Sequence, residues 1–185
     1  MPELLEFRGN DLPDDIRLQV LSFLRIEWPG GFSGPNQYRD WISKPDEHPV
    51  HFVVVESGLL ISHAEVLWKH LDHGGESFKT SGLSGVLTYP GFRRQGFGHQ
   101  VVEAGSKWIL QSDADIAMLW CNPALENFYG AFGWIGLRKA ITLMGPKDDL
   151  RENEELLMML FLSARGKAKQ ASFEAMPIYF GLDTW

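Results

Sequence analysis

Cysteine and long apolar runs are the two features that this chain lacks most clearly. Cys121 is the single cysteine among 185 residues, so no internal disulfide can form and nothing in the cysteine usage argues for export. No apolar run approaches the roughly 20 residues that a membrane-spanning helix needs, and the N-terminal residues do not read as a basic and then apolar signal peptide. We therefore expect a cytoplasmic protein with no membrane partner.

Basic residues are also scarce. The chain has 17 Lys and Arg against 24 Asp and Glu, which gives a formal net charge of −7 at pH 7. An acidic surface repels the phosphate backbone, and no basic stripe offsets that repulsion, so we expect no nucleic-acid partner. The same charge would attract a small cationic molecule.

The rest of the composition is that of an ordinary globular protein. Hydrophobic residues make up 44% of the chain and charged residues 22%, and 185 residues are enough to bury a proper core. No internal repeat, low-complexity tract or linker divides the sequence. We expect a single domain covering residues 1–185.

Apolar periodicity predicts strands and helices that alternate along the chain. A first strand at 4–8 is followed by a helix with Asp11 as its N-cap and Pro13 just inside. Two strands at 51–56 and 59–68 form a hairpin that turns at 57–58. The later elements expected are a short helix at 38–42, a strand at 83–89, a helix at 97–112, a strand at 116–120, a helix at 125–132, and strands at 135–144 and 156–163. This order predicts an α/β or α+β sheet with helices on both faces.

A glycine-containing turn between the strand at 83–89 and the next helix is the most informative local feature. It reads Arg93-Arg94-Gln95-Gly96-Phe97-Gly98. Glycines let a backbone approach a ligand closely, the helix N-terminus adds partial positive charge, and arginines grip phosphate oxygens. The turn therefore predicts a site for a phosphorylated cofactor, against the alternative of a plain turn with two solvated arginines.

Two familiar phosphate-binding loops do not fit this turn. A Walker loop would need Lys and Ser or Thr where Phe97 and Gly98 stand. A dinucleotide fingerprint that started at Gly96 would need its third glycine where Val101 stands.

The turn resembles the pyrophosphate loop of the GNAT acetyltransferases, whose Arg/Gln-x-x-Gly-x-Gly/Ala pattern is matched by Arg93, Gly96 and Gly98. A second motif of that family is matched about 30 residues downstream, where Asn122 is followed by Tyr129 and then by Gly133-Trp134. The order of elements also matches that family. The resemblance implies a central mixed, mostly antiparallel, twisted sheet of about seven strands that is splayed in the middle, with helices on both faces.

The same resemblance implies an acetyl-CoA-dependent N-acetyltransferase. Tyr129 would protonate the departing thiolate as general acid, and Asn122 would hydrogen-bond the pantetheine arm. The other residues implied to bind the cofactor are Val86, Thr88, Arg93, Arg94, Gln95, Gly96 and Gly98, with Gly85 marking a bulge that splays the sheet. No metal is implied, and because dimers are common in the family, a homodimer is allowed.

Within the family, the chain resembles the aminoglycoside 2'-N-acetyltransferases. The resemblance rests on Ile61-Ser62-His63-Ala64, on Gly145-Pro146 followed by a polar acidic loop, and on the final Leu182-Asp183-Thr184-Trp185. It implies that residues 164–185 are an extension near the acceptor site, where Asp183 and the terminal carboxylate of Trp185 contact the acceptor, with Glu152 or Glu154 as loop contacts. A capping role for Trp185 at a hydrophobic edge is the alternative.

One position departs from that pattern. Ser84 stands where those enzymes have a glutamate that acts as general base, and serine does not accept a proton usefully at neutral pH. His63 and Glu65 alternate along a neighbouring strand and face the same side, so either is a candidate base, with a purely structural role as the alternative. An acceptor of low pKa would need no strong base.

The sequence leaves the acceptor open. The leading expectation is direct transfer, in a ternary complex, to a primary amine of a small cationic acceptor such as an aminoglycoside. A peptide, lysine or amino-acid amine is the second. A non-catalytic acyl-CoA sensor is the third, kept open by Ser84 and disfavoured by Tyr129. Cys121 has no obvious activating group, so we expect no acyl-enzyme.

Overall fold

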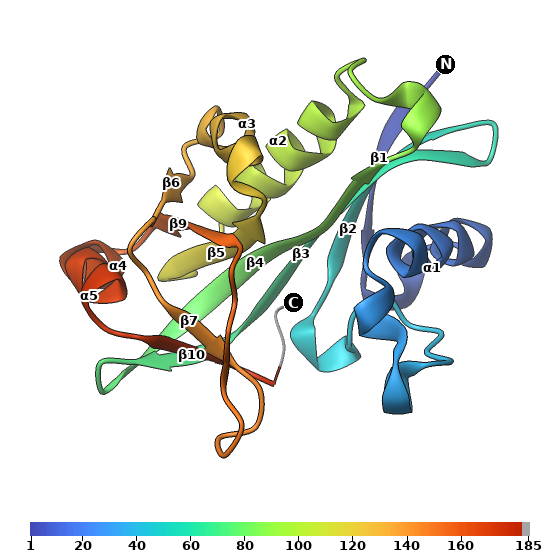
Figure 1. Ribbon diagram of the computed structural model, residues 1–185. Helices are drawn as coiled ribbons and strands as arrows, with labels where there is room; N and C mark the ends of the chain where they lie inside the picture. Colours follow the sequence, from blue (N-terminus) through green and yellow to red (C-terminus); the bar gives the residue numbers. More distant parts are fainter. Residues whose placement is uncertain (183–185) are drawn as a thin grey trace. The chain divides into compact units, whose positions relative to one another are not determined.

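The computed structural model describes residues 1–182, with Pro45 described by its backbone alone. The chain forms two compact units (Figure 1). Unit 1 contains Met1–Leu67 and Ser84–Gly105, and unit 2 contains Trp68–Leu83 and the residues from Ser106 onward.

A sheet of seven strands is the main element of the fold. Its order is β1 (Glu3–Arg8), β2 (Val50–Glu56), β3 (Leu59–His73), β4 (Glu76–Thr88), β5 (Ile116–Cys121), β9 (Leu156–Phe161) and β6 (Ile135–Gly136). Strands β4 and β5 run parallel. The pairs β1–β2, β2–β3, β5–β9 and β6–β9 are antiparallel. The expected mixed, mostly antiparallel seven-stranded sheet is confirmed.

The core of unit 1 forms where helix α1 (Asp14–Glu27) packs on strands of that unit. Its apolar face recurs at helical spacing, as the sequence predicts. The buried members of this core are Leu12, Ile16, Val20, Leu21, Leu24, Phe32, Ile42, Val53, Leu60 and Leu87. The cluster thus joins α1 to residues of β2, β3 and β4.

Two predictions about the start of unit 1 are wrong. Asp11 does not cap α1, because it belongs to a 3-10 turn (Gly9–Asp11) and the helix is preceded by Pro13 in an extended conformation. Residues 38–42 form turns and bends instead of a helix. Five residues are too few to nucleate a helix without strong packing, and the 3-10 turns nearby are Pro29–Phe32, Gly34–Asn36 and Pro45–Glu47.

The hairpin turn predicted at 57–58 is confirmed, and a second turn at Gly74 and Gly75 connects β3 to β4. Ser57 and Gly58 have φ of 50° and 78°, and Gly74 and Gly75 have φ of 58° and 79°. Positive φ at both central residues suits the twist of a two-residue hairpin. Strand β3 continues to His73, five residues beyond its predicted end at 68.

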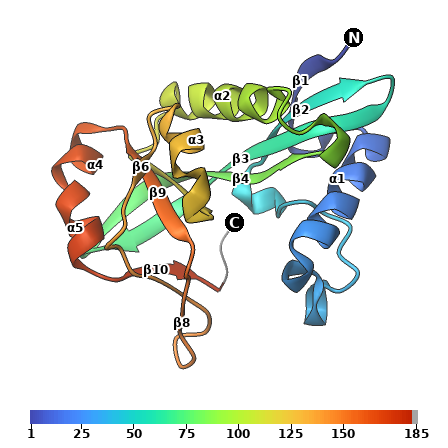
Figure 2. The same ribbon diagram turned by 45° about the horizontal axis from the view of Figure 1, so that its top comes forward.

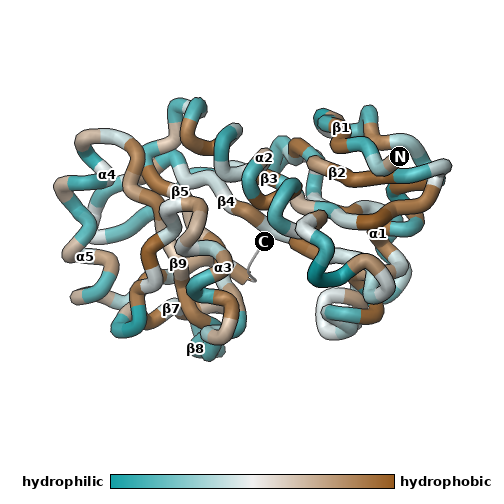
Figure 3. Tube along the Cα trace, turned by 90° about the horizontal axis from the view of Figure 1, so that it is seen from above, coloured by the Kyte–Doolittle hydropathy of each residue, from teal (hydrophilic) through white to brown (hydrophobic). Residues whose placement is uncertain are grey.

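Unit 2 contains the remaining strands and short helices. Helix α2 (Phe97–Leu110) enters it from unit 1, and α3 (Glu126–Gly130), α4 (Ala164–Ala168) and α5 (Gln170–Ala175) are short (Figure 2). A second sheet has the order β10 (Ile178–Gly181), β7 (Thr142–Met144) and β8 (Arg151–Glu152), with β10 parallel and β8 antiparallel to β7. Strands β5 and β9 are strongly apolar (Figure 3).

The predicted strand at 135–144 is wrong. It divides into β6 and β7, which belong to different sheets. A turn in which the Ala140 amide donates to the Leu137 carbonyl separates them. The charged pair Arg138-Lys139 interrupts the apolar alternation at this turn, and that interruption was the sequence signal for the break.

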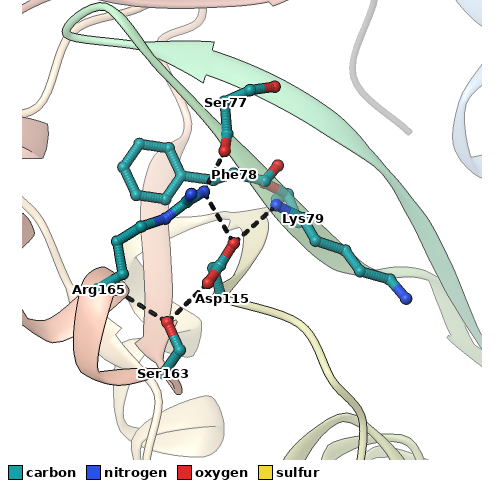
Figure 4. Close-up of polar contacts among 8 residues, drawn as sticks. Ser77, Phe78, Lys79, Asp115, Ser163 and Arg165 are labelled. Atoms are coloured by element: carbon teal, nitrogen blue, oxygen red, sulfur yellow. Dashed lines mark hydrogen bonds and ion pairs between the residues drawn. The ribbon is translucent and has the colours of Figure 1, made fainter.

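A polar cluster at Asp115 joins three segments of unit 2 (Figure 4). The Asp115 carboxylate accepts from Ser163 Oγ at 2.7 Å, from the Lys79 amide at 3.1 Å and from Arg165 Nη2 at 3.0 Å. Arg165 also donates to the Ser77 carbonyl and lies over the Phe78 ring. The cluster therefore anchors the beginning of α4 to β4 and to the start of β5.

Candidate active site

The glycine-containing turn of unit 1 has the backbone that its sequence predicts. It begins with a 3-10 turn (Pro90–Phe92) and leads into α2 at Phe97. Arg94 and Gly96 both have left-handed backbones, with φ of 64° and 87°. A Cβ at Gly96 would meet nothing within 4 Å. Glycine is therefore favoured at this position by its left-handed backbone and not by close packing.

Gly98 has a different role from Gly96. A Cβ at Gly98 would lie 3.1 Å from Thr88 Oγ1, which is tighter than ordinary side-chain contacts. The first turn of α2 therefore lies close to the end of β4, and a larger residue at 98 would require Thr88 to shift by a few tenths of an ångström. Thr88 Oγ1 is in turn 2.9 Å from Ser62 Oγ, which donates to the Leu87 carbonyl.

The polar side chains of the turn are held in different ways. Arg93 donates from Nε to the Thr88 carbonyl at 3.1 Å and from Nη2 to Glu27 Oε1 at 2.8 Å. A bound phosphate would have to compete with Glu27 for that guanidinium. Gln95 donates to the Gly91 carbonyl, and Arg94 is exposed.

The backbone of strand β4 is irregular at Gly85, near the end of the strand. Gly85 has φ of 57°, so the strand leaves the extended conformation there. Ser84, Val86 and Thr88 are half-buried. A left-handed glycine is the first residue of one class of β-bulge, which agrees with the irregularity expected at Gly85.

Three buried polar side chains of unit 1 meet beside Gly85. His63 Nδ1 lies 2.7 Å from the Gly85 carbonyl oxygen, and His63 Nε2 lies 3.2 Å from His51 Nδ1. Glu65 Oε2 lies 3.6 Å from His51 Nδ1, and Glu65 Oε1 accepts from Ser43 Oγ at 2.7 Å. Glu65 Oε2 is buried without a hydrogen-bond partner among the residues that the structure describes.

Burial determines the protonation of these groups. It lowers the pKa of His63 to about 3, with a further lowering from His51 and a partial offset from the Gly85 carbonyl. Burial lowers the pKa of His51 to about 4. Burial also raises the pKa of Glu65 to about 7, with Ser43 and Arg39 acting to lower it and Glu47 to raise it. Near neutral pH both imidazoles are neutral, and the carboxyl group lies close to half-ionised.

His51, His63 and Glu65 each offer one nitrogen or oxygen atom that could ligate a metal ion, and these three atoms lie within 4.8 Å of one another. That spacing suits either a hydrogen-bonded network or a small cation. Because the contacts at 2.7 Å and 3.2 Å are normal hydrogen-bond lengths, we describe the group as hydrogen-bonded. The sequence predicted His63 and Glu65 as neighbours on one face but missed His51.

A cavity of about 310 Å³ lies against this group within unit 1. His51 and Ser43 belong to its wall, whereas His63 and Glu65 do not. The other residues that line it are Gly9, Asn10, Leu12, Asp14, Arg17, Asp40, Trp41, Ile42 and Pro49.

In unit 2, Tyr129 lies on α3 and is 6% exposed. Burial, followed by the effects of Cys121 and Glu155, raises the pKa of its phenol far above the usual range. Tyr129 is therefore protonated throughout the physiological pH range. Burial also raises the pKa of the Cys121 thiol to about 11, which suits an inert buried thiol.

Two other residues of the second motif have local structural roles. Asn122 Oδ1 accepts from the Ala124 amide at 2.9 Å and caps the 3-10 turn Pro123–Leu125. Trp134 is buried and donates from Nε1 to Ser106 Oγ at 3.0 Å.

Glu152 and Glu154 line one cavity of about 230 Å³ in unit 2. The same cavity includes Glu155, whose pKa burial raises, and Arg138. The structure thus brings the two predicted loop contacts together. The other two predicted acceptor contacts, Asp183 and Trp185, lie outside the described residues.

The model of the acetyltransferase (GNAT) domain family matches residues 7–136, well over half of the chain. The chain belongs to the GNAT acetyltransferase family. It is accordingly an acetyl-CoA-dependent N-acetyltransferase, as its sequence motifs predicted.

Solved structures of GNAT proteins share the fold at low sequence identity. An acyl-CoA N-acyltransferase from Pseudomonas aeruginosa has a TM-score of 0.55 at 18% identity, over 86% of this chain and 99% of that one. ElaA from Escherichia coli has a TM-score of 0.59 at 16% identity, with the same coverage. An aminoglycoside 6'-N-acetyltransferase complexed with coenzyme A has a TM-score of 0.59 at 12% identity, over 88% and 98%.

No functionally curated protein matches the sequence. No helix among the described residues is long and apolar enough to cross a membrane.

Proposed function

We propose that this GNAT enzyme transfers the acetyl group of acetyl-CoA to a primary amine of a small cationic acceptor, by direct transfer in a ternary complex. The observation that carries the proposal is the buried group of Glu65, His63 and His51 beside Gly85. It supplies a proton acceptor next to the strand that leads into the cofactor loop. Enzymes place carboxyl and imidazole groups in this way when an amine must lose a proton.

The cofactor would be held by the end of β4 and by the turn that follows. The open space at Gly96, the close approach at Gly98 and the N-terminus of the 14-residue helix α2 all suit a pyrophosphate. The residues proposed to contact the cofactor here are Val86, Thr88, Arg93, Arg94, Gln95, Gly96 and Gly98. Asn122 would contribute its amide nitrogen to the pantetheine arm, because its oxygen is occupied by the cap.

Acid and base are assigned to different residues. Tyr129 is proposed as the acid that protonates the coenzyme A thiolate, since its phenol stays protonated at neutral pH. Ser84 lacks the basicity to replace a glutamate. The base is proposed to lie in the buried group beside Gly85, which holds the two candidates His63 and Glu65 together with His51.

An aminoglycoside is the acceptor that we propose first. Carboxylates recognise polycationic sugars, and the chain offers Glu152 and Glu154 at one cavity, with Asp183 and the carboxylate of Trp185 as further proposed contacts. The net charge of −7 favours the approach of a cation. A single domain over 1–185, with an acceptor-side extension from residue 164, remains our prediction.

The acceptor is tested with aminoglycosides in pairs that differ only in a 2'-amino or a 2'-hydroxyl group. Turnover is followed as free thiol, with polyamines, amino acids and short peptides beside them. Turnover restricted to the 2'-amino members supports the proposal. Turnover of other amines alone would replace the aminoglycoside by a peptide, lysine or amino-acid amine.

The departure at Ser84 favours one second candidate, a non-catalytic acyl-CoA sensor. Tight acetyl-CoA binding together with no turnover on the whole panel would support the sensor over the enzyme.

A further inference from the structure

The hydrogen bonds of the buried group determine which ring nitrogens carry protons. The Gly85 carbonyl can only accept, so His63 Nδ1, 2.7 Å away, must carry the proton. Neutral His63 then has a bare Nε2. His51 Nδ1, 3.2 Å from that bare nitrogen, must donate to it. It follows that neutral His51 has a bare Nε2, on the ring edge opposite to its contact with His63.

Only one of the three side chains, His51, is in a position to contact a molecule in the cavity of unit 1. His51 belongs to its wall, and His63 and Glu65 do not. Because Nδ1 of His51 is turned inward to His63, the bare Nε2 is the nitrogen left for a molecule in the cavity. The volume of about 310 Å³ lies at the lower end of the usual range for ligand pockets, about 300–1,000 Å³. It admits an amine group and its neighbouring atoms rather than a whole oligosaccharide.

Glu65 is placed to stabilise a cation on His51. Its Oε2 lies 3.6 Å from His51 Nδ1 and is buried without a hydrogen-bond partner among the described residues. Its other oxygen is fixed by Ser43 Oγ. Arg39 and Glu47 are the other charged groups that act on this carboxyl, with opposite signs. A buried carboxylate oxygen without a donor is costly unless a positive charge forms beside it.

We propose that His51 is the residue that accepts the proton of the acceptor amine through Nε2, and that His63 and Glu65 position it for this task. The proposal rests on the proposed acetyl transfer. The amine nitrogen forms a bond to the acetyl carbon as the carbon–sulfur bond breaks. One amine proton passes to His51 Nε2, the thiolate takes a proton from Tyr129, and solvent exchange restores both side chains.

The first test is kinetic and uses the full chain. His51→Asn keeps a donor for His63 but removes Nε2, and we expect kcat to fall by about 10²- to 10⁴-fold, with little change in KM for acetyl-CoA. His51→Ala should recover activity when imidazole is added, which a purely structural histidine would not show. His70→Gln, at an exposed histidine of β3 outside this group, is the matched control and should behave like the wild type.

The second readout does not depend on activity. In ¹⁵N-histidine NMR spectra of the wild type, His51 should carry its proton on Nδ1 and leave Nε2 bare. The opposite tautomer, or a stoichiometric metal ion found in the purified protein by elemental analysis, would overturn the proposal. So would wild-type kinetics in His51→Asn. If the wild type acetylates no amine, the proposed function itself fails, while the tautomer still reports whether the hydrogen-bonded chain exists.

Discussion

At the scale of single residues, Glu65 is a carboxyl group in an unusual environment. It is 3% exposed, and burial raises the pKa of its carboxyl to about 7. Its nearest charged and titratable neighbours are His51 and His63 on the sheet and Arg39 and Glu47 on the preceding loop. Its ionisation should therefore affect the stability of the fold and, in our proposal, the proton chemistry of the site.

Glu65→Gln should change how stability depends on pH. A carboxyl whose folded pKa is raised keeps its proton while the unfolded chain has lost it, so its contribution to the free energy of unfolding falls as pH rises from about 4.5 to about 7. The two histidines act with the opposite sign below pH 6.5. Both proteins contain these histidines, so the free energy of unfolding of the wild type minus that of Glu65→Gln should reflect Glu65. This difference should fall as pH rises, by up to about 1.4 kcal/mol per pH unit.

The measurement is urea unfolding at several pH values between 4 and 8. Glu174→Gln, at an exposed glutamate of α5, is the control. A constant difference between wild type and Glu65→Gln over that range would show that Glu65 ionises normally.

Arg93 is the second residue with a specific expectation. Arg93→Ala should weaken acetyl-CoA binding about 10-fold or more, since a hydrogen bond between charged groups contributes about 1.5–3 kcal/mol. Glu27→Gln removes the competing partner of the same guanidinium, so it should leave the affinity unchanged or raise it. Isothermal titration with acetyl-CoA compares the three proteins, and equal affinities would remove Arg93 from the phosphate site.

At the scale of elements, the irregular positions of β4 and of the β2–β3 hairpin shape the site. Gly85 is left-handed, and a Cβ there would lie 3.1 Å from His63 Cε1 and 3.3 Å from His63 Nδ1. Any side chain at Gly85 would therefore disturb both the strand and the histidine that it orients.

Gly85→Ala should cost more stability than the backbone strain alone. Gly58→Ala is the matched control, because Gly58 is also left-handed but has open space where its Cβ would lie. We expect about 1–2 kcal/mol for Gly58→Ala from strain, and a larger loss for Gly85→Ala together with reduced turnover. Urea unfolding and thiol release measure the two effects. Equal losses in the two variants would mean that the contact with His63 is unimportant.

The Asp115 cluster should carry much of the attachment of α4. Burial raises the pKa of Asp115, but Ser163, the Lys79 amide and Arg165 together lower it below its ordinary value. Its contribution to stability is therefore present above about pH 4 and is lost as pH falls further. Asp115→Asn should cost about 1.5–3 kcal/mol at neutral pH.

Chemical denaturation at pH 7 and pH 3 checks this expectation. Asp113→Asn, which affects only an exposed pair with Lys79, should leave stability nearly unchanged. A loss at Asp115→Asn that is the same at both pH values would contradict the assigned role of its charge.

The hairpin shows why the sequence could predict only part of the site. A two-residue turn at 57–58 would pair His51 with Ala64. A register shift between Val54 and Val55 instead pairs His51 with Glu65 and Val53 with His63. That single shift places His51 on the face of His63 and Glu65. Periodicity predicted the hairpin, its turn and the two partners on β3, but nothing in the residue types marked the bulge.

Local motifs were more informative than long-range pairing. The turn at Gly96 could be predicted because its left-handed backbone favours glycine. The division of 135–144 between two sheets depends on contacts that sequence periodicity does not contain. The cap at Asp11 failed for a similar reason, since Pro13 was compatible with more than one helix start.

At the scale of the whole molecule, the chain combines a family-wide fold with an acidic surface. The family is established by the match over residues 7–136, and the fold by solved structures with TM-scores of 0.55 to 0.59. At 12–18% identity these relatives support the fold and leave the acceptor to be determined for this chain. The net charge of −7 is the global property that favours a cationic amine.

We propose that this enzyme moves an acetyl group from acetyl-CoA to a small cationic amine. The most direct measurement follows free thiol release from acetyl-CoA with and without such an amine, and identifies the product by mass spectrometry, with Tyr129→Phe as the comparison. We expect amine-dependent thiol release, one acetylated product, and a large loss of turnover in Tyr129→Phe at unchanged acetyl-CoA affinity. Tight acetyl-CoA binding with no acetylated product from any cationic amine would contradict it.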